Sequence, residues 1–191
     1  MHRFFVDPGA VAGERFPLPG SLAHQVTRVL RLRDGDQITL LNGLGQEVQC
    51  RLEGGECVVV ERRPASREPN HQLTVWQALL KGDHLEPVIR RGTEIGIARF
   101  GLFVSERCVV RELSPRRLDR LRAVAREAAE QSERGIVPPV GEPMDYADAL
   151  NEAAAERAGL AIAGLGPRIL RSETVAVAVA AAVLSRTGDF A

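Results

Sequence analysis

The first third of the chain alternates short apolar runs with turn sequences, which is the pattern of a small β domain. The apolar runs lie at residues 3–6, 37–41 and 57–60, and the turn sequences are Asp34-Gly35-Asp36, Asn42-Gly43 and Gly54-Gly55. Apolar segments of this length, bounded by Gly, Asn and Asp, are typical of strands joined by tight turns. We therefore expect a small β-barrel at residues 1–68.

One helix is expected within this β region, at residues 21–32. Leu22, Val26, Val29 and Leu30 recur at the three- and four-residue spacing that places them on one face of a helix. The sequence therefore predicts a short helix with a single apolar face.

A polar segment at residues 62–70 marks the end of the β region. It contains Pro64 and Pro69, carries several charged side chains and has no hydrophobic periodicity. This composition is typical of a boundary between domains. We expect a second domain at residues 72–191.

In this second domain, strand-like apolar runs alternate with helical patterns. The expected strands lie at residues 73–80, 100–104 and 160–163, and the expected helices at residues 83–95, 114–134 and 173–185. Pro87 and Pro115 fall in first turns, where a helix accepts proline, and Ser172 is expected to cap the last helix. Strands that alternate with helices indicate a parallel α/β sheet.

The last helix is apolar on nearly all sides. It carries Val175, Val177, Val179, Ala181 and Val183 with few polar interruptions. Such a helix must be buried on more than one side, so we expect part of it to pack against a second subunit in a two-fold dimer. Burial within its own domain is the alternative.

The composition of the 191 residues is that of a soluble globular protein, with 45% hydrophobic and 26% charged residues. No apolar run reaches the roughly 20 residues that cross a bilayer, and the opening residues MHRFFVDPG lack the pattern of a signal peptide. We therefore expect a cytoplasmic protein without a membrane partner.

Three cysteines without a CxxC pair, and four histidines without metal-ligand spacing, indicate neither a disulfide framework nor a metal site.

The charge of the chain is formally zero, so its overall field does not indicate a nucleic-acid partner. The kind of cation is more informative, because Lys81 is the only lysine and arginine suits bidentate contact with phosphate. A GC-rich genome would also favour arginine. One local cluster contains Arg116, Arg117, Arg120 and Arg122, and it suits either phosphate or neighbouring carboxylates.

The densest chemical signal is the decamer at residues 165–174, Leu-Gly-Pro-Arg-Ile-Leu-Arg-Ser-Glu-Thr. A Gly-Pro turn leads through the apolar pair Ile169 and Leu170 to a helix start. Unpaired N–H groups at a helix N-terminus bind acceptors on a ligand, and the apolar pair could flank an aromatic ring such as adenine. A plain loop before a capped helix is the alternative. The dinucleotide pattern GxGxxG and the P-loop pattern are absent.

This decamer resembles the C-terminal signature of the bacterial methyltransferases that modify N3 of a uridine in 16S ribosomal RNA, a family of the SPOUT superfamily. Other patterns follow the order of that family. They are His24, residues 29–31 and 35–36, Lys81-Gly82-Asp83 with Glu86, residues 93–96, Ser105-Glu106-Arg107, and residues 127–134 with Pro138.

The resemblance implies an α/β fold with a PUA-like RNA-binding barrel, followed by a SPOUT domain that binds S-adenosylmethionine in loops of a trefoil knot. It also implies a homodimer that acts on ribosomal RNA or the small ribosomal subunit, and it requires no metal. The residues expected to bind the cofactor are Leu165, Gly166, Ile169, Leu170, Arg171 and Thr174.

Catalysis by this family requires stabilisation of the negative charge that spreads onto the uracil oxygens when N3 loses its proton. Arg171 and Arg168 are the candidates, with Arg171 preferred because it directly precedes the helix start. An ion pair with Glu173 is the alternative role. The candidates for RNA binding are Arg3, Arg28, Arg31, Arg33, Arg116, Arg117 and Arg120.

The face formed by Glu127, Glu130, Gln131 and Arg134 follows helical spacing. The resemblance places it toward the site, and an ion-paired face in solvent is the alternative.

The chain departs from the family near residues 151–154. The resemblance implies two further strands and a GPEGG-type loop there, so several tens of residues are expected to be missing at this junction. Either the protein carries a deletion, or the chain joins two pieces of a longer one; we favour the second explanation, because a deletion would leave an inactive protein. The main alternative function is therefore a non-catalytic RNA-binding protein with a degenerate methyltransferase domain. A metabolic α/β enzyme that uses another nucleotide is weaker, because phosphate motifs are absent.

Overall fold

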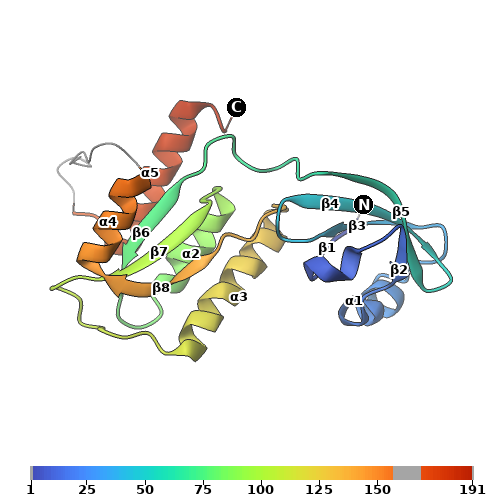
Figure 1. Ribbon diagram of the computed structural model, residues 1–191, viewed down its shortest axis with the longest axis horizontal. Helices are drawn as coiled ribbons and strands as arrows, with labels where there is room; N and C mark the ends of the chain where they lie inside the picture. The colour runs from blue at the N-terminus through green and yellow to red at the C-terminus, as the bar shows by residue number, and fades with distance from the viewer. Residues whose placement is uncertain (1, 157–168, 191) are drawn as a thin grey trace. The chain divides into compact units, whose positions relative to one another are not determined.

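The computed structural model describes residues 2–156 and 169–190 (Figure 1). The chain divides into two compact units. Unit 1 comprises Met1–Glu68 and Ala129–Val137, and unit 2 comprises Pro69–Ala128 and Pro138–Ala191. Unit 1 therefore includes a short segment from the second half of the chain in addition to residues 1–68. No described helix is long and apolar enough to cross a membrane.

Unit 1 is built on a five-stranded sheet with the order β1-β3-β4-β5-β2. The strands are β1 (His2–Phe5), β2 (Arg15–Pro17), β3 (Gln37–Leu41), β4 (Gln46–Glu53) and β5 (Glu56–Pro64). β1 is parallel to β3, and the other pairs are antiparallel. The expected strands β1, β3 and β5 are confirmed. β2 was not predicted because it is short and contains a proline, and β4 was not predicted because polar residues interrupt its apolar positions.

Two short helical segments cover this sheet beside a 3-10 turn, η1 (Pro8–Val11). The α-helix α1 (Gly20–His24) continues into a π-helical turn, η2 (Gln25–Val29), in which the Leu30 N–H donates to the Gln25 carbonyl. Leu22 and Val26 are buried as expected, but Val29 is 62% exposed. Leu30 packs against the same core, so Val29 alone departs from the expected face. The helix also ends at Val29 and not at residue 32. The wider π turn accounts for the exposure of Val29, because it changes the α-helical spacing.

The second half of the chain contributes a buried ion pair to unit 1. Arg134 is only 3% exposed, and its Nη2 lies 2.6 Å from Oε2 of Glu68. The other oxygen of Glu68 accepts the N–H groups of Gly135 and Ile136 at 2.9 and 3.0 Å. One carboxylate at the end of the polar boundary segment thus holds residues 134–136 in place.

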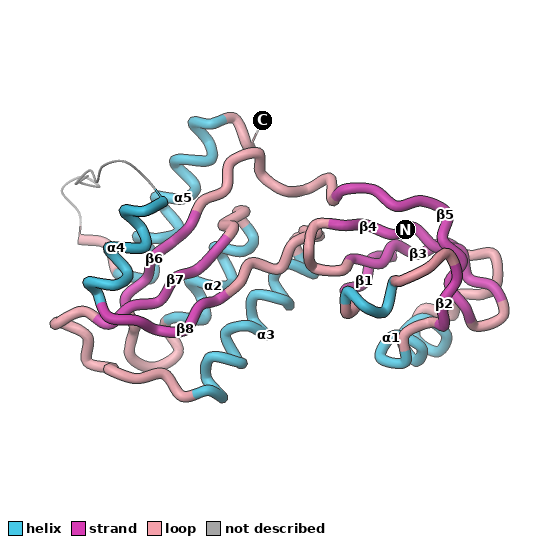
Figure 2. The backbone as a smooth tube through the Cα atoms, viewed as in Figure 1, coloured by secondary structure: helices cyan, strands magenta, loops and turns pink. Residues whose placement is uncertain are grey.

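Unit 2 contains a parallel sheet with the order β6-β7-β8, and Figure 2 shows its three strands side by side. The strands are β6 (Thr74–Ala78), β7 (Arg99–Val104) and β8 (Val140–Asp145). The helices are α2 (Leu85–Glu94), α3 (Pro115–Gln131), α4 (Tyr146–Glu156) and α5 (Ser172–Thr187). The parallel α/β sheet is confirmed. β8, whose apolar residues are few, and α4 were not predicted from the sequence. The strand expected at residues 160–163 lies outside the described residues.

The two faces of this sheet are covered by different helices. Phe100 and Leu102 are fully buried on the face where α2 and α5 pack, and α2 approaches so closely that a Cβ at Gly92 would lie 2.7 Å from the Phe100 ring. On the opposite face, Phe103 of β7 contacts Tyr146 of α4, with ring centroids 5.5 Å apart. α4 continues without a break through residues 151–154, the junction where the resemblance implied missing residues.

The Glu68–Arg134 pair generates a stability prediction. Glu68→Gln keeps the side-chain shape but removes the negative charge opposite a buried guanidinium, which should lower the free energy of unfolding by about 3 to 5 kcal/mol. The control is Glu133→Gln, which removes only the exposed pair with Arg67 and should cost less than about 1 kcal/mol. Chemical denaturation of the two variants measures both effects, and equal losses would contradict the structural role of Glu68.

Candidate functional site

The start of α5 leaves backbone donors available for a ligand. Arg171 is the N-cap residue, in extended conformation, and its carbonyl accepts the N–H groups of Thr174 and Val175 at 2.8 and 3.1 Å. The N–H groups of Ser172 and Glu173 precede the first intrahelical hydrogen bonds, so helix geometry gives them no partner within α5. This end of the helix can therefore bind an acceptor on a small molecule.

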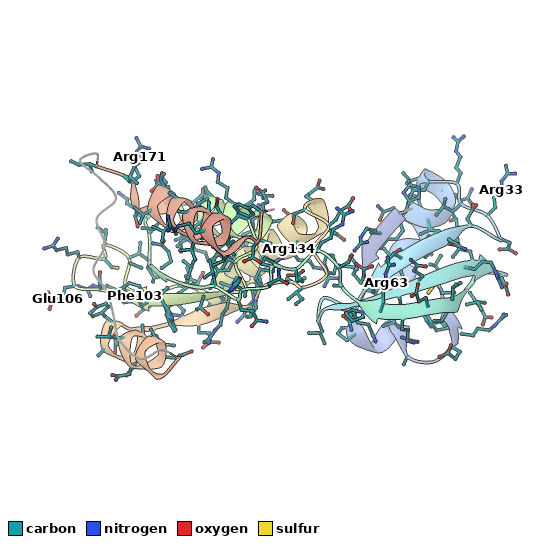
Figure 3. All side chains as sticks on the ribbon, turned by 90° about the horizontal axis from the view of Figure 1, so that it is seen from above. Arg33, Arg63, Phe103, Glu106, Arg134 and Arg171 are labelled. Atoms are coloured by element: carbon teal, nitrogen blue, oxygen red, sulfur yellow. The ribbon has the colours of Figure 1, made fainter. Side chains whose placement is uncertain are left out.

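The Arg171 side chain is open to solvent at this helix start. Its side chain is 83% exposed, and Nη1 lies 3.9 Å from Oε1 of Glu173. In Figure 3, Arg171 points away from the ribbon. A pair this long and exposed is weak, so the guanidinium remains available to an anion.

Ser172 does not cap α5, contrary to the expectation from sequence. It is the first residue of the helix, and the side chain of the N-cap residue Arg171 makes no capping hydrogen bond. Its Oγ instead accepts a hydrogen bond of 3.1 Å from Nε2 of Gln77, a residue of β6. The end of one strand is thereby joined to the start of the last helix.

A second contact brings another sequence pattern to the same place. Nδ1 of His84 lies 3.7 Å from Oε1 of Glu173, and His84 directly follows the Lys81-Gly82-Asp83 pattern. The two patterns are about ninety residues apart in sequence, yet they meet at the first turn of α5. Gln77 and His84 were not among the site residues predicted from the sequence. The one available signal for Gln77 was a lone amide in a strand of otherwise apolar character.

An apolar groove of about 460 Å³ runs along β6 and α5 beside this helix start. Its walls include Val75, Trp76, Phe103, Val175 and Val179, and its polar groups include Gln77 and Ser172. Small-molecule sites typically have this size, with apolar walls and a few placed polar groups. The described part of the groove therefore fits a nucleoside-sized ligand.

The expected cofactor residues are only partly described. Leu165, Gly166 and Arg168 lie outside the described residues. Ile169 is fully exposed and Leu170 is half-buried, while Thr174 is exposed in the first turn of α5.

A basic pocket of about 320 Å³ lies at the start of α3, lined in part by Arg116, Arg117 and Arg120. Arg120 is held by Glu86 at 3.1 Å and by Glu127 at 3.8 Å. Arg116 is exposed, and Nη2 of Arg117 is buried without a hydrogen-bond partner. Arg116 and Arg117 are therefore the members of this cluster whose guanidinium N–H groups remain available to an anion.

The arginines of unit 1 differ in their availability. Arg3 is bound to Glu47, a fully buried carboxylate that also accepts from Arg63 at 3.1 Å. Burial works to raise the pKa of Glu47, but the hydrogen bonds and charges of Arg3 and Arg63 outweigh it and hold the pKa below its ordinary value. Arg3 thus has a structural partner.

The remaining three, Arg28, Arg31 and Arg33, are exposed, and within the described residues none of them has an ion pair. Figure 3 shows Arg33 extending from the surface of unit 1. Arg31 has a left-handed φ of 56°, so it lies beyond the end of the helix. Arg28, in the π turn, and Arg31, beyond it, therefore do not lie on one helical face.

The four residues of the long-helix face predicted from the sequence have different contacts in the structure. Arg134 binds Glu68, and Glu127 pairs with Arg90 at 3.5 Å and with Arg120. Glu130 and Gln131 are exposed. α3 ends at Gln131, so Arg134 lies beyond the helix, and its pair with Glu68 is buried. Among these four residues, Glu127 forms the exposed ion pairs of the alternative. The orientation of this face toward the site stays a prediction.

Comparison with known proteins identifies both regions of the chain. Residues 66–157 match the family model described as an RNA methyltransferase domain, and residues 18–60 match the RNA methyltransferase PUA domain. Ribosomal RNA small subunit methyltransferase E of Bacillus subtilis is 33% identical over 151 residues, which cover 73% of this chain and 59% of the relative. The Mycobacterium tuberculosis protein of the same name is 36% identical over 147 residues, which cover 72% of this chain and 55% of that relative. The chain thus spans little more than half the length of these relatives.

A solved structure extends the similarity to the fold. The Neisseria gonorrhoeae ribosomal RNA small subunit methyltransferase E, bound to S-adenosyl methionine, is 26% identical with a TM-score of 0.79, covering 97% of this chain and 98% of that one. A methyltransferase from Legionella pneumophila has a TM-score of 0.70 at 21% identity and shares the fold. These matches confirm the resemblance seen in the sequence.

Proposed function

We propose that this chain, with its RNA methyltransferase domain and PUA domain, is an S-adenosylmethionine-dependent methyltransferase that modifies N3 of a uridine in 16S ribosomal RNA. The observation that carries the proposal is the helix start at α5, where the decamer pattern, the Lys81-Gly82-Asp83 segment and an apolar groove meet. Its substrate is ribosomal RNA or the small ribosomal subunit in the cytoplasm.

The residues of the helix start suit the cofactor. When bound, S-adenosylmethionine supplies an electrophilic methyl group on a sulfonium. The N–H groups of Ser172 and Glu173 would bind acceptor atoms, and Ile169 and Leu170 would flank the adenine. Leu165, Gly166 and Thr174 complete the proposed cofactor set.

The chemical task of the protein is to make uracil N3 nucleophilic and to align it. N3 loses its proton to solvent, the N3–methyl bond forms, and the sulfur–methyl bond breaks in line with it. Arg171, aided by Arg168, would stabilise the charge on the uracil oxygens. Arg171 is exposed and only weakly paired, so it can turn toward an incoming base.

Two finer features belong to the same proposal. We extend it to a closed barrel in unit 1 and to a trefoil knot in the SPOUT domain, as the resemblance implies.

The alternative of a degenerate, non-catalytic RNA-binding protein depends on the junction at residues 151–154. The mass of the intact purified protein decides between a deletion and a longer chain.

The cofactor proposal predicts measurable binding. Calorimetry with S-adenosylmethionine should detect one site per chain in a protein of confirmed mass. Arg171→Ala should lower the methylation rate of small-subunit RNA by roughly 10²- to 10³-fold, because it removes one charge-stabilising group, while RNA affinity stays unchanged. Arg186→Ala, in the exposed last turn of the same helix, is the control and should retain activity. Absence of any cofactor binding would refute the proposal.

The RNA proposal predicts a change in salt dependence. The double variant Arg28→Ala/Arg31→Ala should bind RNA more weakly, and the slope of log affinity against log salt should decrease by about one for each phosphate that the protein no longer neutralises. Cofactor affinity should not change. The matched control is Arg15→Ala/Arg51→Ala, because both arginines are already paired with Glu53. If the first variant keeps the original slope, these arginines do not dock the RNA.

The dimer proposal rests on the exposed apolar surface of α5. Val179 and Val183 are each 38% exposed in the single chain, which leaves part of the helix for a second subunit. Sedimentation at micromolar concentration should give the mass of a dimer, and Val179→Glu should shift it toward the monomer because a charge would enter the interface. A monomeric mass for the unmodified protein would exclude the dimer.

A further inference from the structure

Gln77 is a buried amide in an apolar setting. It is 5% exposed, its neighbours in β6 include Val75 and Trp76, and its register partner in β7 is Leu102. Burying a polar group without hydrogen bonds is unfavourable, so an apolar side chain would suit the position better for packing alone. The contacts of its amide therefore suggest a specific role.

The amide of Gln77 has one side-chain partner in the described structure. Nε2 donates to Oγ of Ser172 at 3.1 Å and to the carbonyl oxygen of Ala78 at 3.1 Å. Ser172 is 95 residues away in sequence and lies between Arg171 and Glu173, at the two N–H groups that α5 leaves unpaired. A restraint on Ser172 is consequently a restraint on the whole first turn.

The rest of α5 provides little directional restraint. Its buried residues are Ala180 and Leu184, and apolar contacts are non-directional. Apolar contacts alone do not specify how a helix is rotated about its axis, and a rotation would swing the N–H groups and Arg171 away from the groove. The far end is fixed by Asp189, which accepts the Asn70 N–H at 2.6 Å and lies 2.9 Å from Nδ1 of His71. At the near end, the Gln77–Ser172 hydrogen bond at 3.1 Å is shorter than the His84–Glu173 contact at 3.7 Å.

We propose that Gln77 is a positioning residue: its hydrogen bond to Ser172 sets the rotation of the first turn of α5, and so aims the unpaired N–H groups at the cofactor and Arg171 at the uracil. This inference rests on the proposed function for the identity of the ligand. The Gln77–Ser172 contact itself is independent of that identity.

The experiment is a double-mutant cycle with two readouts. Ser172→Ala removes the acceptor at an exposed position, so folding should be retained, and Gln77→Leu removes the donor at similar volume. Each should weaken binding of S-adenosylhomocysteine, measured by calorimetry, about tenfold. The double variant should be no weaker than either single one, since both substitutions remove the same hydrogen bond. Ser172→Thr keeps the hydroxyl and should restore affinity. Ser185→Ala, at an exposed position near the other end of the same helix and outside the groove, is the control and should bind normally.

The second readout is hydrogen exchange in the first turn of α5, which needs no ligand. The amides of residues 173–176 should exchange several-fold faster in Ser172→Ala, whereas those near Leu184 should not change. Unchanged exchange and unchanged affinity in Ser172→Ala, or additive losses in the double variant, would overturn the role of Gln77. A wild-type protein of confirmed mass that binds no nucleoside would instead overturn the proposed function, and with it the cofactor role assigned to Gln77.

Discussion

The unpaired N–H groups at the start of α5 are the constraint on which the candidate site depends. A helix cannot satisfy its own first donors, and the side chain of the N-cap residue Arg171 does not bond to them. Ser172, which could have served as a cap, is instead occupied by Gln77 of β6. The donors therefore remain available at the mouth of an apolar groove, where an acceptor on a nucleoside can satisfy them without competition from the protein.

The parallel sheet explains why distant segments meet at this point. Parallel strands end at the same edge, and loops at that edge commonly bind ligands in α/β folds. The loop after β6 carries the Lys81-Gly82-Asp83 pattern and brings His84 to Glu173 of α5.

A net charge of zero is compatible with RNA binding, because the positions of the arginines differ in how available their charges are. Many arginines are paired with carboxylates, whereas Arg28, Arg31 and Arg33 stay exposed in unit 1.

The second half of the chain contributes to unit 1 through one carboxylate. Glu68 pairs with Arg134 and accepts two backbone N–H groups from the following residues. A sequence boundary drawn at the polar segment near residue 68 does not anticipate this contact, because the pairing joins residues 66 positions apart. The same pairing gives Arg134 a structural role in unit 1.

Local pattern was sufficient for the elements that carry strong periodicity or clear end signals. The strands at residues 37–41 and 99–104, and the helices that start near Pro87 and at Pro115, followed from apolar spacing and proline placement, and the decamer at 165–174 identified the family. Three features were decided only by tertiary structure. β8 pairs in parallel with β7. Val29 is exposed because a π turn changes the helical spacing. The hydroxyl of Ser172 does not cap the helix but accepts a hydrogen bond from Gln77. In each case the deciding interaction comes from hydrogen bonding that local hydrophobic periodicity does not encode.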